Sequence, residues 1–364
     1  MRLKTVLGVS AVTATAVTAG VGIGAGLLLR ELYRRLRSGE SLAGKVVLIT
    51  GGSRGLGFAL AQEFARHGSR LAICARSQRE LENARSHLIA MGAEVLAVTC
   101  DVGVDDDVQS LVNEVIARFG RIDILVNNAG VIAVGPLESQ TLSDFQEAMD
   151  VMFWGVVYPT LAVLPQMMKR RSGQIANITS IGGKVSVPHL LPYNCAKFAA
   201  VGFSEGLRAE MAKHGISVTT VVPGLMRTGS HLNAYFKGKN QDEFTWFSLG
   251  ATLPLVAMDG NRAARKIVAA ISRRQSEVIL TPQAKLMARA QGMFPGATAD
   301  LLGMVNRALP NAGVSGRERH LGRESETAVT RSFLTALGRK AARELNQTAA
   351  PEYPAEQVSG AQPA

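Results

Sequence analysis

Three side chains in one stretch of the sequence, Ser180, Tyr193 and Lys197, have the types and spacing needed for acid–base chemistry. Tyr193 and Lys197 are four residues apart in a segment with helical periodicity, so we expect both side chains on one face of a helix. An ammonium group beside a phenol favours the phenolate, and such a phenol can donate or accept a proton near neutral pH. Ser180 follows residues 174–179, an apolar run typical of a buried strand. A Tyr-x-x-x-Lys pair can also be a chance pair on a surface, so independent support is needed.

A second motif, far upstream, supplies that support. Residues 50–57 read Thr-Gly-Gly-Ser-Arg-Gly-Leu-Gly and join the strand-like residues 45–50 to a helix predicted over residues 56–67. A glycine-rich turn from strand to helix lets backbone amides and the helix N-terminus approach a pyrophosphate. The two motifs together favour a functional interpretation of the tyrosine and lysine.

These motifs occur in the order found in the short-chain dehydrogenase/reductase family, which the sequence resembles over about residues 42–282. The matching segments are residues 50–57, Asn127-Asn-Ala-Gly130, Ser180, Tyr193-x-x-x-Lys197 and Pro223-Gly224. The resemblance implies hydride transfer between a nicotinamide cofactor and a carbonyl or alcohol. It further implies that Tyr193 transfers the proton and that Ser180 hydrogen-bonds the substrate oxygen. Lys197 would lower the pKa of Tyr193 and bind the nicotinamide ribose.

Strand-like and helix-like segments alternate after residue 44, which predicts a parallel sheet with helices on both faces. The predicted strands are residues 45–50, 70–74, 94–100, 122–127, 174–179, 216–222 and 277–280. Seven strands fit the doubly wound (Rossmann) α/β fold of the family. We also predict one helix over residues 143–170, and another that begins after Asp259 as its N-cap.

The end of the second predicted strand indicates which cofactor binds. An acid there would hydrogen-bond the adenosine ribose and repel a phosphate, but the sequence has Ala75 followed by Arg76. The family resemblance places Arg54 at the same point, so we expect NADP(H); the alternative is that both arginines are ordinary solvated charges. Asp101 matches the family's adenine contact; the alternative is a plain role as a helix N-cap or in a turn. The residues that the resemblance assigns to the cofactor are Gly51, Ser53, Arg54, Gly55, Leu56, Gly57, Arg76, Asp101, Val102, Asn128, Ala129, Gly130, Tyr193, Lys197, Pro223, Gly224 and Thr228.

Two segments concern the substrate side. Where the family usually has an asparagine that helps to hold a water in a proton relay, this chain has Met152, which puts the relay in doubt. Residues 225–258 match a variable substrate lid, and five aromatic residues lie there. They could cover a lipophilic substrate, dock on a bilayer or pack the lid itself. These residues are Tyr235, Phe236, Phe244, Trp246 and Phe247.

The N-terminal region contains a stretch of 25 residues without a charge, residues 5–29. At about 1.5 Å per residue it is long enough to cross a hydrocarbon core. More basic residues follow it than precede it, which favours a membrane anchor with the catalytic domain in the cytoplasm. The alternative is a signal peptide cleaved after Ala14-Thr-Ala16, but export would separate the chain from its cofactor. The stretch could also lie on the membrane rather than span it.

Composition limits the other function classes. The net charge of +11 divides into +4 for residues 1–40, +4 for 41–281 and +3 for 282–364, so no concentrated basic face for nucleic acid is expected. The three cysteines have no metal-like spacing, and we expect no metal site and a reducing compartment. The resemblance also implies a homo-oligomer.

We therefore predict four segments and one main function. Residues 1–37 are a membrane-anchor helix with its basic flank, 41–281 the catalytic domain, 282–347 a helical extension and 348–364 a disordered tail. The predicted function is oxidation or reduction of a small, lipophilic carbonyl or alcohol with NADP(H). One alternative is a membrane-associated nucleotide-binding sensor or scaffold without turnover. Another is a membrane interaction protein that acts through its glycine-bearing N-terminal helix.

Overall fold

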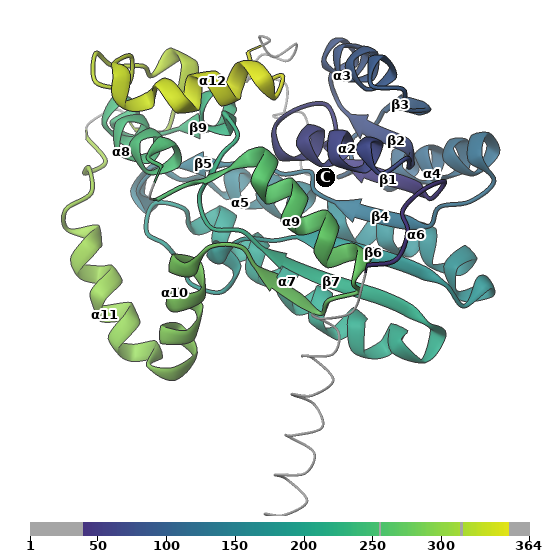
Figure 1. The fold of residues 1–364 in the computed structure, drawn as a ribbon. Helices are drawn as coiled ribbons and strands as arrows, with labels where there is room; N and C mark the ends of the chain where they lie inside the picture. Colours follow the sequence, from purple (N-terminus) through teal and green to yellow (C-terminus); the bar gives the residue numbers. More distant parts are fainter. Residues whose placement is uncertain (1–38, 255, 314–315, 349–364) are drawn as a thin grey trace, which may run out of the picture.

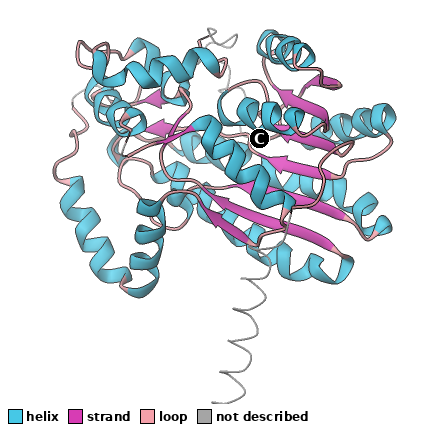
Figure 2. Cartoon of the chain, in the orientation of Figure 1, coloured by secondary structure: helices cyan, strands magenta, loops and turns pink. Residues whose placement is uncertain are grey.

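The computed structural model describes residues 39–254, 256–313 and 316–348. Its centre is a parallel sheet of seven strands in the spatial order β3-β2-β1-β4-β6-β7-β11 (Figures 1 and 2). All seven predicted strands are present, with each end within two residues of its predicted position, and the doubly wound fold is confirmed. The strands are β1 (Val46–Thr50), β2 (Arg70–Ala75), β3 (Val95–Thr99), β4 (Ile124–Asn127), β6 (Gly173–Ile178), β7 (Ile216–Val222) and β11 (Glu277–Ile279).

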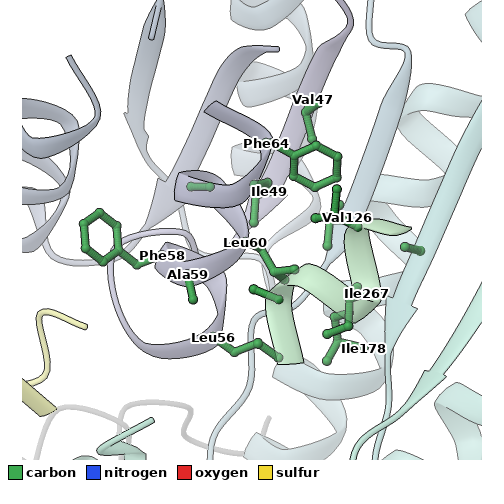
Figure 3. Close-up of a cluster of buried hydrophobic side chains, with 14 of the residues drawn as sticks. Val47, Ile49, Leu56, Phe58, Ala59, Leu60, Phe64, Val126, Ile178 and Ile267 are labelled. Atoms are coloured by element: carbon green, nitrogen blue, oxygen red, sulfur yellow. The ribbon is translucent and has the colours of Figure 1, made fainter. Parts of the chain in front are cut away.

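Side chains of β1 alternate between two buried clusters, one on each face of the sheet. Val47 and Ile49 join the cluster under α2 and α9, where they contact Phe64 and its neighbours (Figure 3). Val46 and Leu48 join the cluster on the opposite face. Because both faces are covered, the central strands read as continuous apolar runs rather than alternating ones. The first face is covered by α2 (Gly55–Arg66), α3 (Gln78–Ala90) and α9 (Gly260–Ser272), and the second by α4 (Asp105–Phe119), α6 (Gly155–Arg170) and α7 (Leu191–Met211).

The helix predicted over residues 143–170 is a continuous helical run with an irregularity in its middle. α5 (Leu142–Met149) passes through a π-helical turn, Asp150–Trp154, into α6. Within the described residues this run alone is long and apolar enough to cross a membrane by length and composition. It packs against α4, α7 and strands β4 and β6, so much of it belongs to the core. The predicted anchor, residues 5–29, lies outside the described residues.

A lid covers one end of the sheet and has a small core of its own. Its short strands are β5 (Ala133–Val134), β9 (Tyr235–Phe236) and β12 (His320–Leu321), which pair in the order β12-β9-β5, and its helix is α8 (Asn240–Thr252). Phe236, Phe244 and Phe247 are buried together. Among the three roles considered for the lid aromatics, these three phenylalanines therefore have the packing role.

The C-terminal extension is helical and returns to the catalytic domain. After α10 (Pro282–Met293) and α11 (Pro295–Asn306) it supplies β12 to the lid and ends in α12 (Ala336–Glu344), which packs on α8. Figure 1 shows α10 and α11 as a pair beside the sheet and α12 above the lid. The helix predicted between residues 331 and 345 is thus present over its second half, and Asp259 caps α9 as predicted.

A buried ion cluster joins the lid, the extension and α5. The Asp144 carboxylate accepts hydrogen bonds from Lys237 of the lid, at 2.6 Å, and from Arg319 of the extension, at 2.6 Å. Burial alone would raise the pKa of Asp144, but the hydrogen bonds from Lys237, Thr141 and Arg319 outweigh it and lower the pKa below its ordinary value. The carboxylate therefore stays charged and holds three separate segments together.

Candidate active site

The site begins where β1 ends, because only four residues separate the strand from α2 and the start of the helix lies very close to this turn. Gly51 and Gly55 have positive φ angles of 62° and 59°, which glycine adopts at little cost. A Cβ atom on Gly57 would lie 2.0 Å from the carbonyl oxygen of Gly51. The N-cap of α2, Arg54, makes no side-chain capping hydrogen bond. Amides in the first turn of α2 are thus left for other acceptors, and a pyrophosphate suits such a position.

The end of β4 fixes the floor of the site. The amides of Asn128 and Ala129 donate to the Thr50 hydroxyl oxygen, at 2.9 and 3.2 Å. The Asn128 side chain donates to the carbonyls of Thr50 and Gly51, at 3.0 and 3.1 Å. Asn127 is buried and donates to Asn177 of β6, at 2.8 Å. The two asparagines therefore tie three neighbouring strand ends together beneath the site, as expected for this motif.

The three proton-transfer candidates meet at the end of β6. Ser180 follows the strand and accepts a hydrogen bond from the Gly182 amide, at 3.0 Å, while Tyr193 and Lys197 lie on α7. The Tyr193 hydroxyl is hydrogen-bonded to Ser180. The Lys197 ammonium lies 5.8 Å from the centre of the Tyr193 ring and donates to the carbonyl of Ile178, at 2.9 Å. The arrangement expected from the spacing is present.

Burial shifts the pKa values of Tyr193 and Lys197. It lowers the pKa of Lys197 from 10.5 to about 8. It also raises the pKa of Tyr193 above its ordinary value, and the hydrogen bond with Ser180 offsets only part of the rise. We expected Lys197 to lower the tyrosine pKa; the pKa of Tyr193 is raised in this structure, and Lys197 is not among the causes of the shift. Desolvation disfavours the charge of the ammonium itself.

One cavity of about 320 Å³ joins all of these features. It is lined by Ser180, Tyr193 and Lys197 and by every residue that the sequence assigned to the cofactor. Its floor has no room for a side chain on Gly51 or Gly57, and its rim carries the guanidinium groups of Arg54 and Arg76. The residues present therefore fit a dinucleotide.

Acidic residues balance the two arginines at the adenosine end. Arg54 donates to Glu80, at 2.9 Å, and the Arg76 guanidinium lies 4.0 Å from the Asp101 carboxylate. Glu80 is buried and also accepts from the Ser53 hydroxyl, at 3.3 Å. Asp101 is not the N-cap of α4, since Val104 has that position; its carboxylate accepts from the Gly103 amide in the connecting turn. Glu80 was missed because its position in the sequence is that of an ordinary first-turn acid.

Met152 occupies the position where the family usually has an asparagine. It is fully buried in the π-helical turn and lines the cavity. A Cβ atom on Gly130 would lie 3.6 Å from its sulfur. A thioether is only a weak acceptor and has no donor, so Met152 contributes an apolar surface where an amide would bind water.

Seven further lining residues come from the lid and the extension: Met226, Ser230, Asn233, Ala234, Tyr235, Leu321 and Gln347. Two of them, Leu321 and Gln347, lie beyond the segment that resembles the family, and their sequence neighbourhood has no motif. Only the return of the chain over the lid brings them to the site.

Comparisons with known proteins agree with this geometry. A family model described as short chain dehydrogenase matches residues 45–236. A dehydrogenase/reductase SDR family protein 7-like from Anopheles gambiae is 36% identical over 262 residues, which are 70% of this chain and 81% of that protein. Matched solved structures include a Burkholderia phymatum short-chain dehydrogenase/reductase in complex with NAD (25% identity, TM-score 0.60, 70% of this chain and 94% of that one). Another is a single-residue variant of actinorhodin polyketide ketoreductase with NADPH (27% identity, TM-score 0.58, 67% and 98%).

The close approach of α2 to β1 can be tested with two glycine substitutions. We expect Gly57→Ala to lower the free energy of unfolding by about 1–3 kcal/mol, because the added methyl group meets backbone that cannot move freely. Gly206→Ala is the matched control on α7, where nothing lies within 4 Å of the added Cβ. It should stabilise the protein by about 0.5–1 kcal/mol. Urea titration measures both, and equal effects would contradict the packing argument.

Proposed function

This chain belongs to the short-chain dehydrogenase/reductase family, and we propose that it uses NADP(H) to interconvert a carbonyl and an alcohol on a small, lipophilic substrate. The observation that carries the proposal is the convergence of Ser180, Tyr193 and Lys197 on the cavity that the glycine turn borders. The three residues and the glycine turn come from two separate regions of the chain. A chance surface pair of tyrosine and lysine would not share a cavity with a phosphate-binding turn.

A bound nicotinamide supplies the hydride in reduction or accepts it in oxidation. The chain's own residues handle the proton and the substrate oxygen. In reduction the Tyr193 hydroxyl donates its proton to the carbonyl oxygen, and the Ser180 hydroxyl stabilises the developing negative charge. Because burial raises the pKa of Tyr193, the hydroxyl stays protonated at neutral pH, as a proton donor must. Lys197, held by the Ile178 carbonyl, has further ammonium protons for the ribose of the cofactor.

The preference for NADP(H) is supported by the charges around the adenosine end. No acid stands at the end of β2, where Ala75 is followed by Arg76. Arg54 and Arg76 both line the cavity, and each guanidinium lies within 4.0 Å of one carboxylate, that of Glu80 and that of Asp101. A phosphate binds guanidinium through paired, charge-assisted hydrogen bonds, which a ribose hydroxyl cannot match.

We also propose that the protein is anchored in a membrane through residues 5–29, with the catalytic domain on the cytoplasmic side. The described part of the chain adds support in α10 and α11. Large apolar side chains there are exposed, among them Leu286 at 70%, Phe294 at 62% and Met304 at 58%. An apolar helix pair suits contact with lipid. The pair begins beside the site, where Ala284 of α10 lies against Gly224.

Removal of the Tyr193 hydroxyl tests the mechanism. We expect Tyr193→Phe to lower NADPH-dependent turnover of a carbonyl substrate by about 10²–10⁴-fold, because the proton donor is lost, while NADPH binding persists. Tyr158→Phe is the control, since that phenol lies on α6 outside the cavity. Full turnover by Tyr193→Phe would rule the mechanism out. Binding of NADPH by the wild type without turnover on a broad carbonyl and alcohol panel would favour the sensor instead.

Cofactor choice is tested with Arg76→Gln. We expect the Kd for NADPH to rise about tenfold to a hundredfold, as loss of a charged hydrogen bond implies, and the Kd for NADH to stay the same. Arg85→Gln on α3 is the matched control, because that arginine pairs with Glu82 in the same helix. Fluorescence titration with each cofactor gives both constants. An equal effect on NADH would show that Arg76 does not recognise the phosphate.

The anchor is tested by deleting residues 1–37. The full chain should sediment with membranes, and the shortened chain should move to the soluble fraction with its turnover of a water-soluble carbonyl intact. Ultracentrifugation after a carbonate wash separates the two states. A shortened chain that still sediments with membranes would show that the anchor lies elsewhere.

A further inference from the structure

Residues 345–347, which we call the C-terminal strap, lie against the glycine turn although almost three hundred residues separate them in sequence. The Gly55 amide, in the first turn of α2, donates to the carbonyl of Leu345, at 2.8 Å. The Asn346 side chain donates to the carbonyls of Ser53, at 2.9 Å, and Glu80, at 3.2 Å. The strap thus bonds to both the turn and the start of α3.

The strap is firmly held rather than loosely placed. The Leu345 side chain is 2% exposed and belongs to the core cluster under α2 and α9. A Cβ atom on Gly260, at the start of α9, would lie 2.9 Å from it. Asn346 takes a left-handed conformation, with φ of 56°, which asparagine tolerates better than most residues. This conformation lets the chain turn from the core toward the cavity.

Gln347 bridges the cavity from the glycine turn to the lid. Its side-chain oxygen accepts from the Asn233 side chain, at 2.5 Å, and its carbonyl accepts from the same amide, at 3.0 Å. Its Nε2 atom lies against the start of α2, where a Cβ atom on Gly55 would be 2.5 Å away. Gln347 is only 4% exposed and lines the cavity. Across the described ranges no side chain or carbonyl accepts a hydrogen bond from this nitrogen, so a donor faces the place where a pyrophosphate is expected.

Arg323, also from the extension, does not line the cavity but contacts two residues that do, Asn233 and Gln347. It donates to the Asn233 side-chain oxygen and to the carbonyl of Gln347. Its Nε atom is buried and has no partner among the described residues. Burial lowers the pKa of Arg323, and the nearby charge of Arg54 lowers it further. Two guanidinium groups close to one another, one with an unused donor, are a suitable environment for an anion.

We propose that the C-terminal strap forms the outer wall of the pyrophosphate site, with Gln347 Nε2 donating to the phosphate oxygens. Arg323 holds Asn233 and Gln347 in place from behind this wall and adds a positive charge close to them. This proposal rests on the proposed dinucleotide function. The pyrophosphate would then lie between this wall and the first-turn amides of α2, whose N-terminal charge also favours an anion. Cofactor affinity would depend on a segment outside the part of the chain that matches the family.

The test measures the Kd of the full-length protein for NADPH and for NADH with Arg323→Gln, Gln347→Ala and Gln347→Glu. Both cofactors contain the pyrophosphate, so Arg323→Gln should raise both constants, by about tenfold to a hundredfold. Gln347→Glu keeps an oxygen for Asn233 but replaces the donor with a negative charge. It should therefore weaken cofactor binding more than Gln347→Ala does. If Gln347 had a purely structural role, Gln347→Glu would not be expected to weaken binding more than Gln347→Ala.

Arg331→Gln is the matched control, because it makes the same change on the same extension in a side chain that is 68% exposed. Melting temperatures identify any variant that fails to fold. If Arg323→Gln fails to fold, the comparison of Gln347→Ala with Gln347→Glu still tests the proposal. Unchanged constants in the folded variants would overturn the proposal, and so would an effect confined to NADPH, which would place the contact at the ribose phosphate. Such results would not contradict the proposed function if the wild-type protein binds the cofactor and converts a substrate. A wild type that binds neither cofactor would overturn both.

Discussion

The structure depends on the absence of a side chain where α2 begins. Gly57 lies so close to Gly51 that a Cβ atom would sit 2.0 Å from a carbonyl oxygen. This contact lets the helix start at the edge of the sheet, and its N-terminus points into the cavity. Asn128 holds the other side of the same turn, so two strand ends and one helix end are fixed relative to each other. Tyr193 borders the same cavity as this fixed edge.

Much of this arrangement could be predicted from the sequence, because it follows from local patterns. Continuous apolar runs such as residues 46–50 predict buried parallel strands, and parallel strands place their carboxyl ends at one edge. The π-helical turn at Asp150–Trp154 could not be predicted, since helical periodicity does not separate it from a regular turn. The pair of Lys237 and Asp144 could not be predicted either, because 93 residues separate its members and only the folded lid brings them together.

The protonation states of the site residues could not be predicted from the sequence either. The spacing of Tyr193 and Lys197 gives their common face, but their pKa values depend on how much water the finished cavity admits. Burial raises the pKa of the tyrosine and lowers that of the lysine to about 8, so both shifts disfavour charge. A dinucleotide would bring a ribose to the ammonium and change this balance. With the raised pKa the tyrosine hydroxyl stays protonated at neutral pH.

Two residues that line the cavity, Leu321 and Gln347, come from a segment that the family match, residues 45–236, does not include. The lid and the extension need strong ties to the catalytic domain, because isolated loops would not keep lining residues in place. Asp144 supplies one tie by accepting from Lys237 and Arg319, and the buried Leu345 supplies another. Breaking a buried ion cluster of this kind costs about 3–5 kcal/mol, so the lid cannot separate freely from α5.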